Sequence, residues 1–219
     1  GITVRPATGG RAGLSIKAIK EGLLYLKQTP SVFGAMALDM FGVIFASAEA
    51  LLPIYANDIL GAGSQGYGLL ISARGVGAFG TSLILTMLPP VKATGKWMVL
   101  TVAGYALATV GFGFATWFPL SLLTYGLTGA TDQISVVMRQ SIIQLGTPDE
   151  LRGRVSSVNQ VFIQASSQIG AIESGVVATA FNSPVIAVVT GGLGCLVALL
   201  VIVRLIPQLW QHRTESVHA

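Results

Sequence analysis

The chain has 219 residues, of which 52% are hydrophobic and 10% charged, whereas a soluble domain carries about 25% charged residues. The mean hydropathy of +0.71 agrees with this excess of apolar residues. The composition argues against a water-soluble fold and predicts a membrane protein. The single cysteine, Cys195, excludes a disulfide framework or a cysteine-based metal site, and the basic residues do not cluster as a nucleic-acid surface requires.

The first 29 residues form a basic segment ahead of the apolar part of the chain. They begin at Gly1 without a signal-peptide pattern, so we expect a piece of a longer or trimmed protein. Residues 14–28 place apolar side chains near helical spacing, with lysines opposite. We predict that 1–29 is a cytoplasmic linker with an interfacial amphipathic helix. A solvated linker helix is the alternative.

Six apolar runs follow, each near the roughly 20 residues that a helix needs to cross a bilayer. We predict transmembrane spans at about 31–56, 67–88, 97–115, 119–144, 154–181 and 185–206, and a tail at 207–219. The runs are continuous, which argues against the alternating pattern of a β-barrel. The predicted fold class is an all-α membrane protein with a six-transmembrane-helix bundle at 30–206.

Prolines mark where these helices begin, at positions that lose no hydrogen bond; they are Pro30, Pro119, Pro148 and Pro184. Pro53 lies inside the first run and predicts a kink near the outer end of that helix. Before the fifth run, Thr147 and Glu150 have the spacing of a capping box. We therefore predict that Thr147 is the N-cap of the fifth helix.

The placement of basic residues predicts the orientation, because Lys and Arg accumulate in cytoplasmic loops. Twelve of the 13 Lys and Arg residues lie in the leader, near 92–96, at the junction of the fourth and fifth runs, or near the C-terminus, and the remaining one is Arg74. The loops 57–66, 116–118 and 182–184 contain none. We therefore predict a multi-pass protein of the cell inner (cytoplasmic) membrane with both termini cytoplasmic.

Ionisable residues inside membrane helices are costly and are functional candidates by default. Asp39, Asp132 and Glu173 are our candidates for proton coupling, because a carboxylate without a fixed cation can exchange protons near neutral pH. Binding of cationic groups of a substrate is the alternative role for these three acids. Asp39 and Glu173 have no obvious partner in the sequence. Two pairs are candidates for static ion pairs instead: Glu49 with Arg74 at matching depths, and Asp132 with Arg139 two helical turns along one face.

Polar and small residues recur at helical spacing in several runs. Gln160, Gln164 and Gln168 follow one another at four-residue steps. This stripe predicts a wall of a water-filled cavity, to which we assign Gln164 and Gln168, with hydrogen bonding between helices as the alternative. Small residues such as those at 73–81 predict close helix packing, and helix bending during a transport cycle is a second interpretation.

An enzyme is not expected. His212 and His218 both lie in the tail, and the runs hold no pair of nucleophile and base and no metal-ligand spacing. We therefore predict no catalytic residue, metal or cofactor.

Several segments together carry a family resemblance over nearly the whole chain. They are Glu-Gly-Leu-Leu-Tyr-Leu-Lys-Gln-Thr-Pro at 21–30, Leu-Leu-Pro-Ile-Tyr-Ala at 51–56, Gly-Tyr-Gly-Leu-Leu at 66–70, Gly-Val-Gly-Ala at 75–78, Asp-Gln-Ile-Ser-Val-Val-Met-Arg-Gln at 132–140 and Thr-Pro-Asp-Glu-Leu-Arg-Gly-Arg-Val at 147–155. These segments resemble the major facilitator superfamily. More narrowly, they are similar to its transmembrane secretion effector branch, which includes enterobactin-exporter-like and macrolide-efflux-like proteins.

The resemblance implies that the chain is the C-terminal six-helix half of a twelve-helix transporter, with the substrate cavity between the halves. It implies efflux of small amphipathic molecules such as siderophores or drugs by alternating access, as a proton antiporter. The expected partners are the substrate, protons, the lipid bilayer and an N-terminal six-helix half or a second copy, and not nucleic acid. An importer of the same fold and a non-transporting membrane subunit are the alternatives.

One loop departs from the superfamily pattern. Residues 89–96 lack the acidic residue and arginine pair of the usual gating loop and keep Gly95 and Lys96. We therefore expect residues 147–154 to carry the cytoplasmic gating contacts, through the four charged side chains Asp149, Glu150, Arg152 and Arg154.

Overall fold

The computed structural model describes residues 16–46, 48–89, 91 and 93–211, and these residues form helices and their connections, without a strand. The rest of the predicted leader and of the tail, including His212 and His218, lies outside the described residues. The helices are α1 (Ile16–Gln28), α2 (Pro30–Ala46), η1 (Glu49–Leu51), α3 (Leu52–Ile54), η2 (Tyr55–Ile59), α4 (Gly63–Met87), α5 (Thr94–Phe114), α6 (Phe118–Gly146), α7 (Asp149–Ala180), α8 (Pro184–Leu205) and α9 (Pro207–Gln211).

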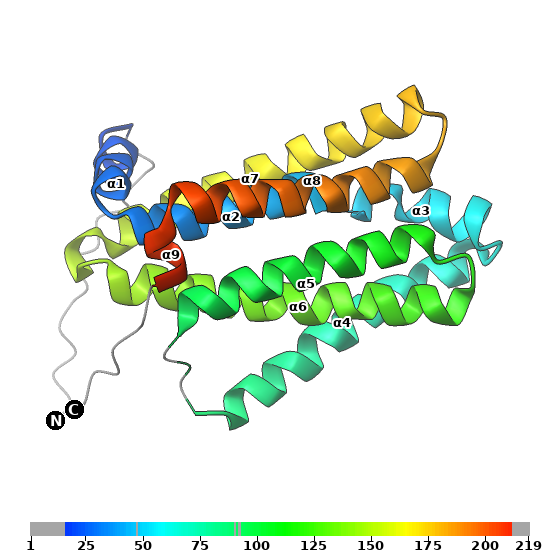
Figure 1. The fold of residues 1–219 in the computed structure, drawn as a ribbon, viewed down its shortest axis with the longest axis horizontal. Coiled ribbons are helices and arrows are strands. Elements are labelled where there is room, and N and C mark those ends of the chain that lie inside the picture. The colour runs from blue at the N-terminus through cyan, green and yellow to red at the C-terminus, as the bar shows by residue number, and fades with distance from the viewer. Residues whose placement is uncertain (1–15, 47, 90, 92, 212–219) are drawn as a thin grey trace, which may run out of the picture.

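The long helices run along one common direction (Figure 1). Five of the six apolar runs coincide with one long helix each, although α4 and α7 begin four and five residues before the predicted 67 and 154, and the first run corresponds to α2 and the short helices after it. By length and composition, four segments of the described chain are apolar enough to cross a membrane: Pro30–Ile59, Gly63–Met87, Thr94–Phe114 and Pro184–Leu205. Helices α6 and α7, with 29 and 32 residues, are long enough but more polar, so the count of six spans stays a prediction.

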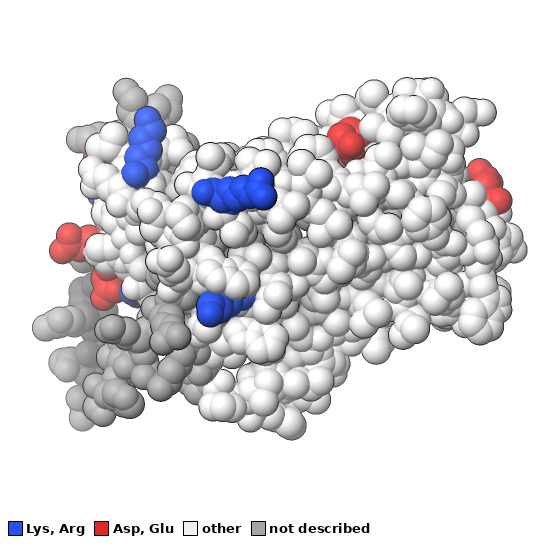
Figure 2. Space-filling model, in the orientation of Figure 1, with Lys and Arg blue, Asp and Glu red and all other residues white. Residues whose placement is uncertain are grey.

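The two ends of the bundle differ in charge. One end holds α1, α9 and the α4–α5 and α6–α7 connections, and the other holds α3 and the α5–α6 and α7–α8 connections (Figure 1). On the face in Figure 2, the basic side chains lie in the half of the molecule that holds α1 and α9, and the opposite half carries acidic side chains alone. Of the basic side chains that predicted the orientation, those that the structure describes on this face therefore gather at one end of the bundle.

The predicted kink near Pro53 is a complete break in the first long helix. Helix α2 ends at Ala46, and a 3₁₀ turn, the short α3 and a π-helical turn follow, with Pro53 in the first turn of α3. A proline removes one backbone donor and crowds the carbonyl four residues earlier, here that of Glu49. The carbonyl of Ala46 accepts hydrogen bonds from the Tyr105 hydroxyl at 2.9 Å and the Thr109 hydroxyl at 3.3 Å. Side chains of α5 thus satisfy the broken end of α2.

Helices α4 and α6 approach so closely that glycine is required between them. A Cβ atom on Gly77 would lie 2.0 Å from the Gly126 carbonyl oxygen, and one on Gly129 would lie 2.1 Å from the Arg74 carbonyl oxygen. The small residues near 73–81 therefore serve helix packing. Gly75, by contrast, faces open space.

The predicted capping box at Thr147 is wrong. Pro148 is the N-cap of α7, its carbonyl accepts from the Leu151 and Arg152 backbone, and no side chain caps the helix. The Thr147 hydroxyl is buried and has no hydrogen-bond partner among the described residues. Thr147 instead ends α6 in an extended conformation, so its side chain belongs to the end of one helix and does not start the next.

Helix α1 packs onto the bundle instead of standing apart from it. Its Leu26 side chain is 2% exposed and belongs to the main hydrophobic core, which also holds Val155 and Val158 of α7. The Tyr25 hydroxyl donates a hydrogen bond to the Gly146 carbonyl at the end of α6. The sequence pattern therefore identified a helix correctly, and its packing shows that one face rests on protein.

Candidate functional site

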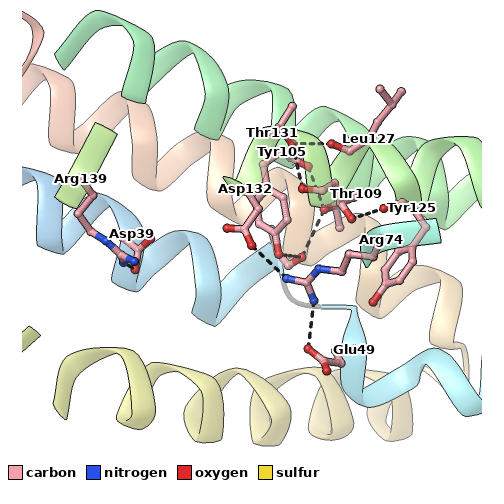
Figure 3. A network of polar contacts seen from close by, with 12 residues as sticks. Asp39, Glu49, Arg74, Tyr105, Thr109, Tyr125, Leu127, Thr131, Asp132 and Arg139 are labelled. Carbon is pink, nitrogen blue, oxygen red and sulfur yellow. Dashed lines mark hydrogen bonds and ion pairs between the residues drawn. The ribbon is translucent and has the colours of Figure 1, made fainter. Parts of the chain in front are cut away.

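Arg74 of α4 joins two carboxylates from different parts of the fold. Its Nη1 atom lies 3.1 Å from Glu49 Oε2, and its Nη2 atom lies 3.2 Å from Asp132 Oδ2. The arginine and Asp132 side chains are 29% and 32% exposed, whereas Glu49 is 66% exposed. Figure 3 shows the guanidinium between the two acids, with Tyr125 close by. The predicted Glu49–Arg74 pair is present, and Asp132 is an additional partner.

Two backbone features place this cluster. The break after α2 puts Glu49 at the start of a 3₁₀ turn instead of on a continuous helix. The contact of α4 with Gly129 brings the backbone of Arg74 against α6. Gly129 lies about one helical turn before Asp132. A side chain at position 129 would separate the two helices and with them the two charges.

Asp39 and Arg139 form a second pair, between α2 and α6. The Arg139 Nη1 atom contacts Asp39 Oδ2, and the two side chains are 8% and 5% exposed for Asp39 and Arg139. The pair lies apart from the Arg74 cluster (Figure 3). The predicted Asp132–Arg139 pair is wrong, because each residue pairs across to another helix. The expectation that Asp39 has no partner is wrong for the same reason.

A small cavity lies between the two charge pairs. It has a volume of about 10 Å³ and is lined by Asp39, Gly42, Val43, Val102, Tyr105, Asp132 and Ser135. Asp39 of α2 and Asp132 of α6, which are both predicted proton-coupling residues, therefore border one cavity. The Ser135 hydroxyl is buried there and has no hydrogen-bond partner among the described residues.

Tyr105 and Ser135 are not among the residues that the sequence predicts for this site. Ser135 follows Asp132 by three residues and precedes Arg139 by four, so all three share one face of a helix. That spacing was a usable signal. Tyr105 gave none, because its role depends on the broken end of α2, which accepts its hydrogen bond.

The glutamine stripe lies on an open face of α7. Gln160, Gln164 and Gln168 line a groove of 670 Å³ together with Ser157, Val161 and Ala165. The three glutamines are exposed, so the described part of the chain does not use them to join helices. Glu173 lies further along α7, is partly buried, and accepts a hydrogen bond from the Ser174 hydroxyl at 3.4 Å.

The charged residues of 147–154 make contacts at the α1 end of the bundle. Arg154 pairs with Glu21 of α1. Arg152 lies 2.6 Å from Asp149 within the first turn of α7, and Glu150 is exposed. In this structure Arg154 therefore ties the leader helix to α7, and the gating role of these residues stays a prediction.

Within the described residues, no group of three or more His, Cys, Asp or Glu side chains is placed to hold a metal ion. The acids described above have arginine partners, apart from Glu173, which accepts from a hydroxyl, and Glu150, which is exposed.

Comparison with known proteins gives the same family as the sequence segments. Residues 12–218 match the family model described as transmembrane secretion effector. Proteins named enterobactin exporter EntS from Escherichia coli O81 (strain ED1a) and E. coli O1:K1 / APEC are 26% identical over 194 residues, which is 87% of this chain and 46% of each relative. The chain thus spans about half the length of these curated relatives. No solved structure matches it significantly.

Proposed function

Because the chain belongs to the transmembrane secretion effector family of the major facilitator superfamily, we propose that it is one half of a proton-coupled exporter of small amphipathic molecules. Family and relatives indicate a membrane transporter active in efflux, not an enzyme. The enterobactin exporters suggest a siderophore or a molecule of similar chemistry as the substrate. The observation that carries the proposal is the set of paired acids inside a bundle of apolar helices.

We propose six spans with both termini cytoplasmic. The basic end of the bundle supports this orientation, since cytoplasmic loops are rich in Lys and Arg. Helices α6 and α7 run the length of the bundle with the four more apolar segments. The polar residues that lower the hydropathy of α6 include Asp132 and Arg139, which are paired inside the bundle, where charged residues of membrane helices are tolerated.

The substrate would pass along the open face of α7. Glutamine amides facing lipid would leave donors and acceptors unsatisfied, so the groove of Gln164 and Gln168 favours a covering by water, substrate or a second bundle. In transporters built from two bundles, the substrate site lies at their interface, and rocking of the bundles gives alternating access. The covering half would be a preceding six-helix segment or a second copy of this chain.

Proton coupling would use Asp39, Asp132 and Glu173. We propose that protonation of an acid releases its arginine or hydroxyl partner, which changes the packing between α2, α4 and α6. The two charge pairs supply such partners for Asp39 and Asp132. For Glu173, partial burial beside Ser174 is the support.

The test is transport by the complete protein in vesicles of phosphatidylethanolamine and phosphatidylglycerol. With enterobactin as the probe, an imposed pH gradient should drive flux with coupled proton movement. Asp132→Asn should abolish the response to the gradient. Wild-type behaviour of Asp39→Asn, Asp132→Asn and Glu173→Gln would contradict the coupling assignment.

The same vesicles separate the competing functions. Flux toward the extracellular side under a physiological gradient indicates an exporter, and the opposite direction indicates an importer. A panel of other amphipathic molecules follows if enterobactin does not move. No substrate-dependent proton flux with any compound would favour a non-transporting subunit.

A further inference from the structure

The cavity between Asp39 and Asp132 contains a polar group that the rest of the fold leaves unused. Ser135 is 3% exposed and its hydroxyl has no hydrogen-bond partner among the described residues. A buried hydroxyl without a partner costs about 1–3 kcal/mol. The cavity of about 10 Å³ that it borders is close to the smallest space that holds one water molecule.

The lining supplies the partners that a buried water needs. Such a water makes about three hydrogen bonds. Asp39, Asp132, Ser135 and Tyr105 all line the cavity. Together they carry two carboxylates, a hydroxyl, and a phenol oxygen that donates to the Ala46 carbonyl and can still accept. The site thus has both acceptors and a donor for a single water.

The charges around the cavity favour a neutral occupant and one mobile proton. Asp39 and Asp132 are each already matched by an arginine, so a metal cation would compete with both. With Glu49 included, three carboxylates face two guanidinium groups, which leaves one negative charge that a proton neutralises. Among the described residues, Tyr105 on α5, Tyr125 on α6 and Cys195 on α8 are further titratable side chains near these charges.

We propose that one water molecule, held by Ser135, fills this cavity and passes protons between Asp132 and Asp39. Protonated Asp132 gives its proton to the water as the water gives one of its own to Asp39, so the water is restored and one proton has moved. The path joins the Arg74 cluster to the Arg139 pair. The inference rests on the proposed proton coupling and adds Ser135 as the positioning residue of the relay.

Infrared spectroscopy tests the water without a substrate. Difference spectra between acidic and neutral pH are recorded on the complete protein in phosphatidylethanolamine and phosphatidylglycerol vesicles, in H₂¹⁶O and H₂¹⁸O. We expect an O–H band that shifts with ¹⁸O. It should vanish in Ser135→Val and Asp39→Asn and persist in Ser135→Thr, which has the shape of valine but keeps the hydroxyl. Absence of the band from the wild type, or its persistence in Ser135→Val, would overturn the proposal.

Transport of enterobactin in the same vesicles tests the relay. Ser135→Val should lower gradient-driven flux about tenfold, the effect of one lost hydrogen bond on a rate, while Ser135→Thr stays within about twofold. Exchange of labelled enterobactin at equal pH should stay within about twofold in both. Ser135→Ala should lose as much gradient-driven flux as Ser135→Val. Because alanine is smaller than serine and cannot clash, this variant controls for misfolding caused by the larger valine side chain.

The outcomes separate the two proposals. If the wild type responds to the gradient, Asp132→Asn does not, and Ser135→Val and Ser135→Ala behave as wild type, then proton coupling stands and the water relay is wrong. If wild-type flux ignores the gradient, the coupling part of the proposed function is wrong. The infrared result then still decides whether Ser135 holds a water.

Discussion

A single guanidinium holds the cluster of Glu49, Arg74 and Asp132 together. Arg74 donates from two different nitrogens to Glu49 and Asp132, a geometry that the planar fork of arginine allows and the point charge of lysine does not reproduce. Asp132 is the less exposed of the two acids, so its carboxylate depends more on the arginine.

We expect Arg74→Gln to lower the stability of the complete protein in detergent, because it leaves Asp132 unpaired. Adding Asp132→Asn should recover part of the loss, with an interaction of about 1 kcal/mol between the two sites. Adding Glu49→Gln should recover less, because Glu49 is 66% exposed and exposed pairs contribute little. Thermal unfolding of the single and double variants measures these terms. Equal recovery by both would contradict the ranking.

The buried pair of Asp39 and Arg139 should be more sensitive. Removing one partner of a buried ion pair leaves an uncompensated charge and costs about 3–5 kcal/mol. We expect this loss for Asp39→Asn and for Arg139→Gln, and recovery of most of it in the double variant. Unfolding in denaturing detergent gives the stability. If the double variant is stable yet transports without regard to the pH gradient, the pair has a role in coupling beyond folding.

At the scale of the helix, the break after α2 is held by side chains from α5. The Tyr105 hydroxyl has the shorter hydrogen bond to Ala46, and the Thr109 hydroxyl also donates to the Tyr105 carbonyl at 2.9 Å. We expect Tyr105→Phe to cost about 1 kcal/mol, measured by thermal unfolding. Thr109→Val is the matched control and should cost less, because its contact with Ala46 is 3.3 Å. A larger loss of stability in Thr109→Val than in Tyr105→Phe would show that Thr109, and not Tyr105, mainly stabilises the end of α2.

The close contact between helices α4 and α6 gives a second prediction at the scale of the helix. Gly129→Ala would place a Cβ atom 2.1 Å from the Arg74 carbonyl oxygen, so the two helices must move apart. We expect a clear loss of thermal stability and a weaker link between Arg74 and Asp132. Gly75→Ala on α4 meets nothing within 4 Å and should be neutral or slightly stabilising, since alanine favours helix over glycine. Similar losses in both would show that the contact does not set the packing.

At the scale of the whole molecule, chemical labelling of the open face of α7 tells whether water or lipid covers that face. In the complete protein with Cys195→Ala, Gln164→Cys and Gln168→Cys should react with a water-soluble maleimide. Ile169→Cys, on the neighbouring face of α7 and 51% exposed, should react more slowly because lipid excludes the reagent. Labelling rates before and after addition of enterobactin measure the difference. Equal rates at all three positions would argue against a water-filled cavity.

The sequence by itself determined the class of the protein, the positions of its long helices and its family. Apolar run length and loop charge are local properties, so they survive without knowledge of packing. Residue positions along the predicted spans also gave the matching depths of Glu49 and Arg74, which predicted their pair. The four-residue spacing of the glutamines predicted the polar face of α7.

The tertiary structure decided what depends on the rotation of each helix about its axis. That rotation pairs Asp132 with Arg74 and Arg139 with Asp39, although Asp132 and Arg139 lie on one face of α6. It also brings Asp39, Asp132 and Ser135 around one cavity, because close packing at Gly77 and Gly129, and the broken end of α2 against Tyr105, fix which helix faces which.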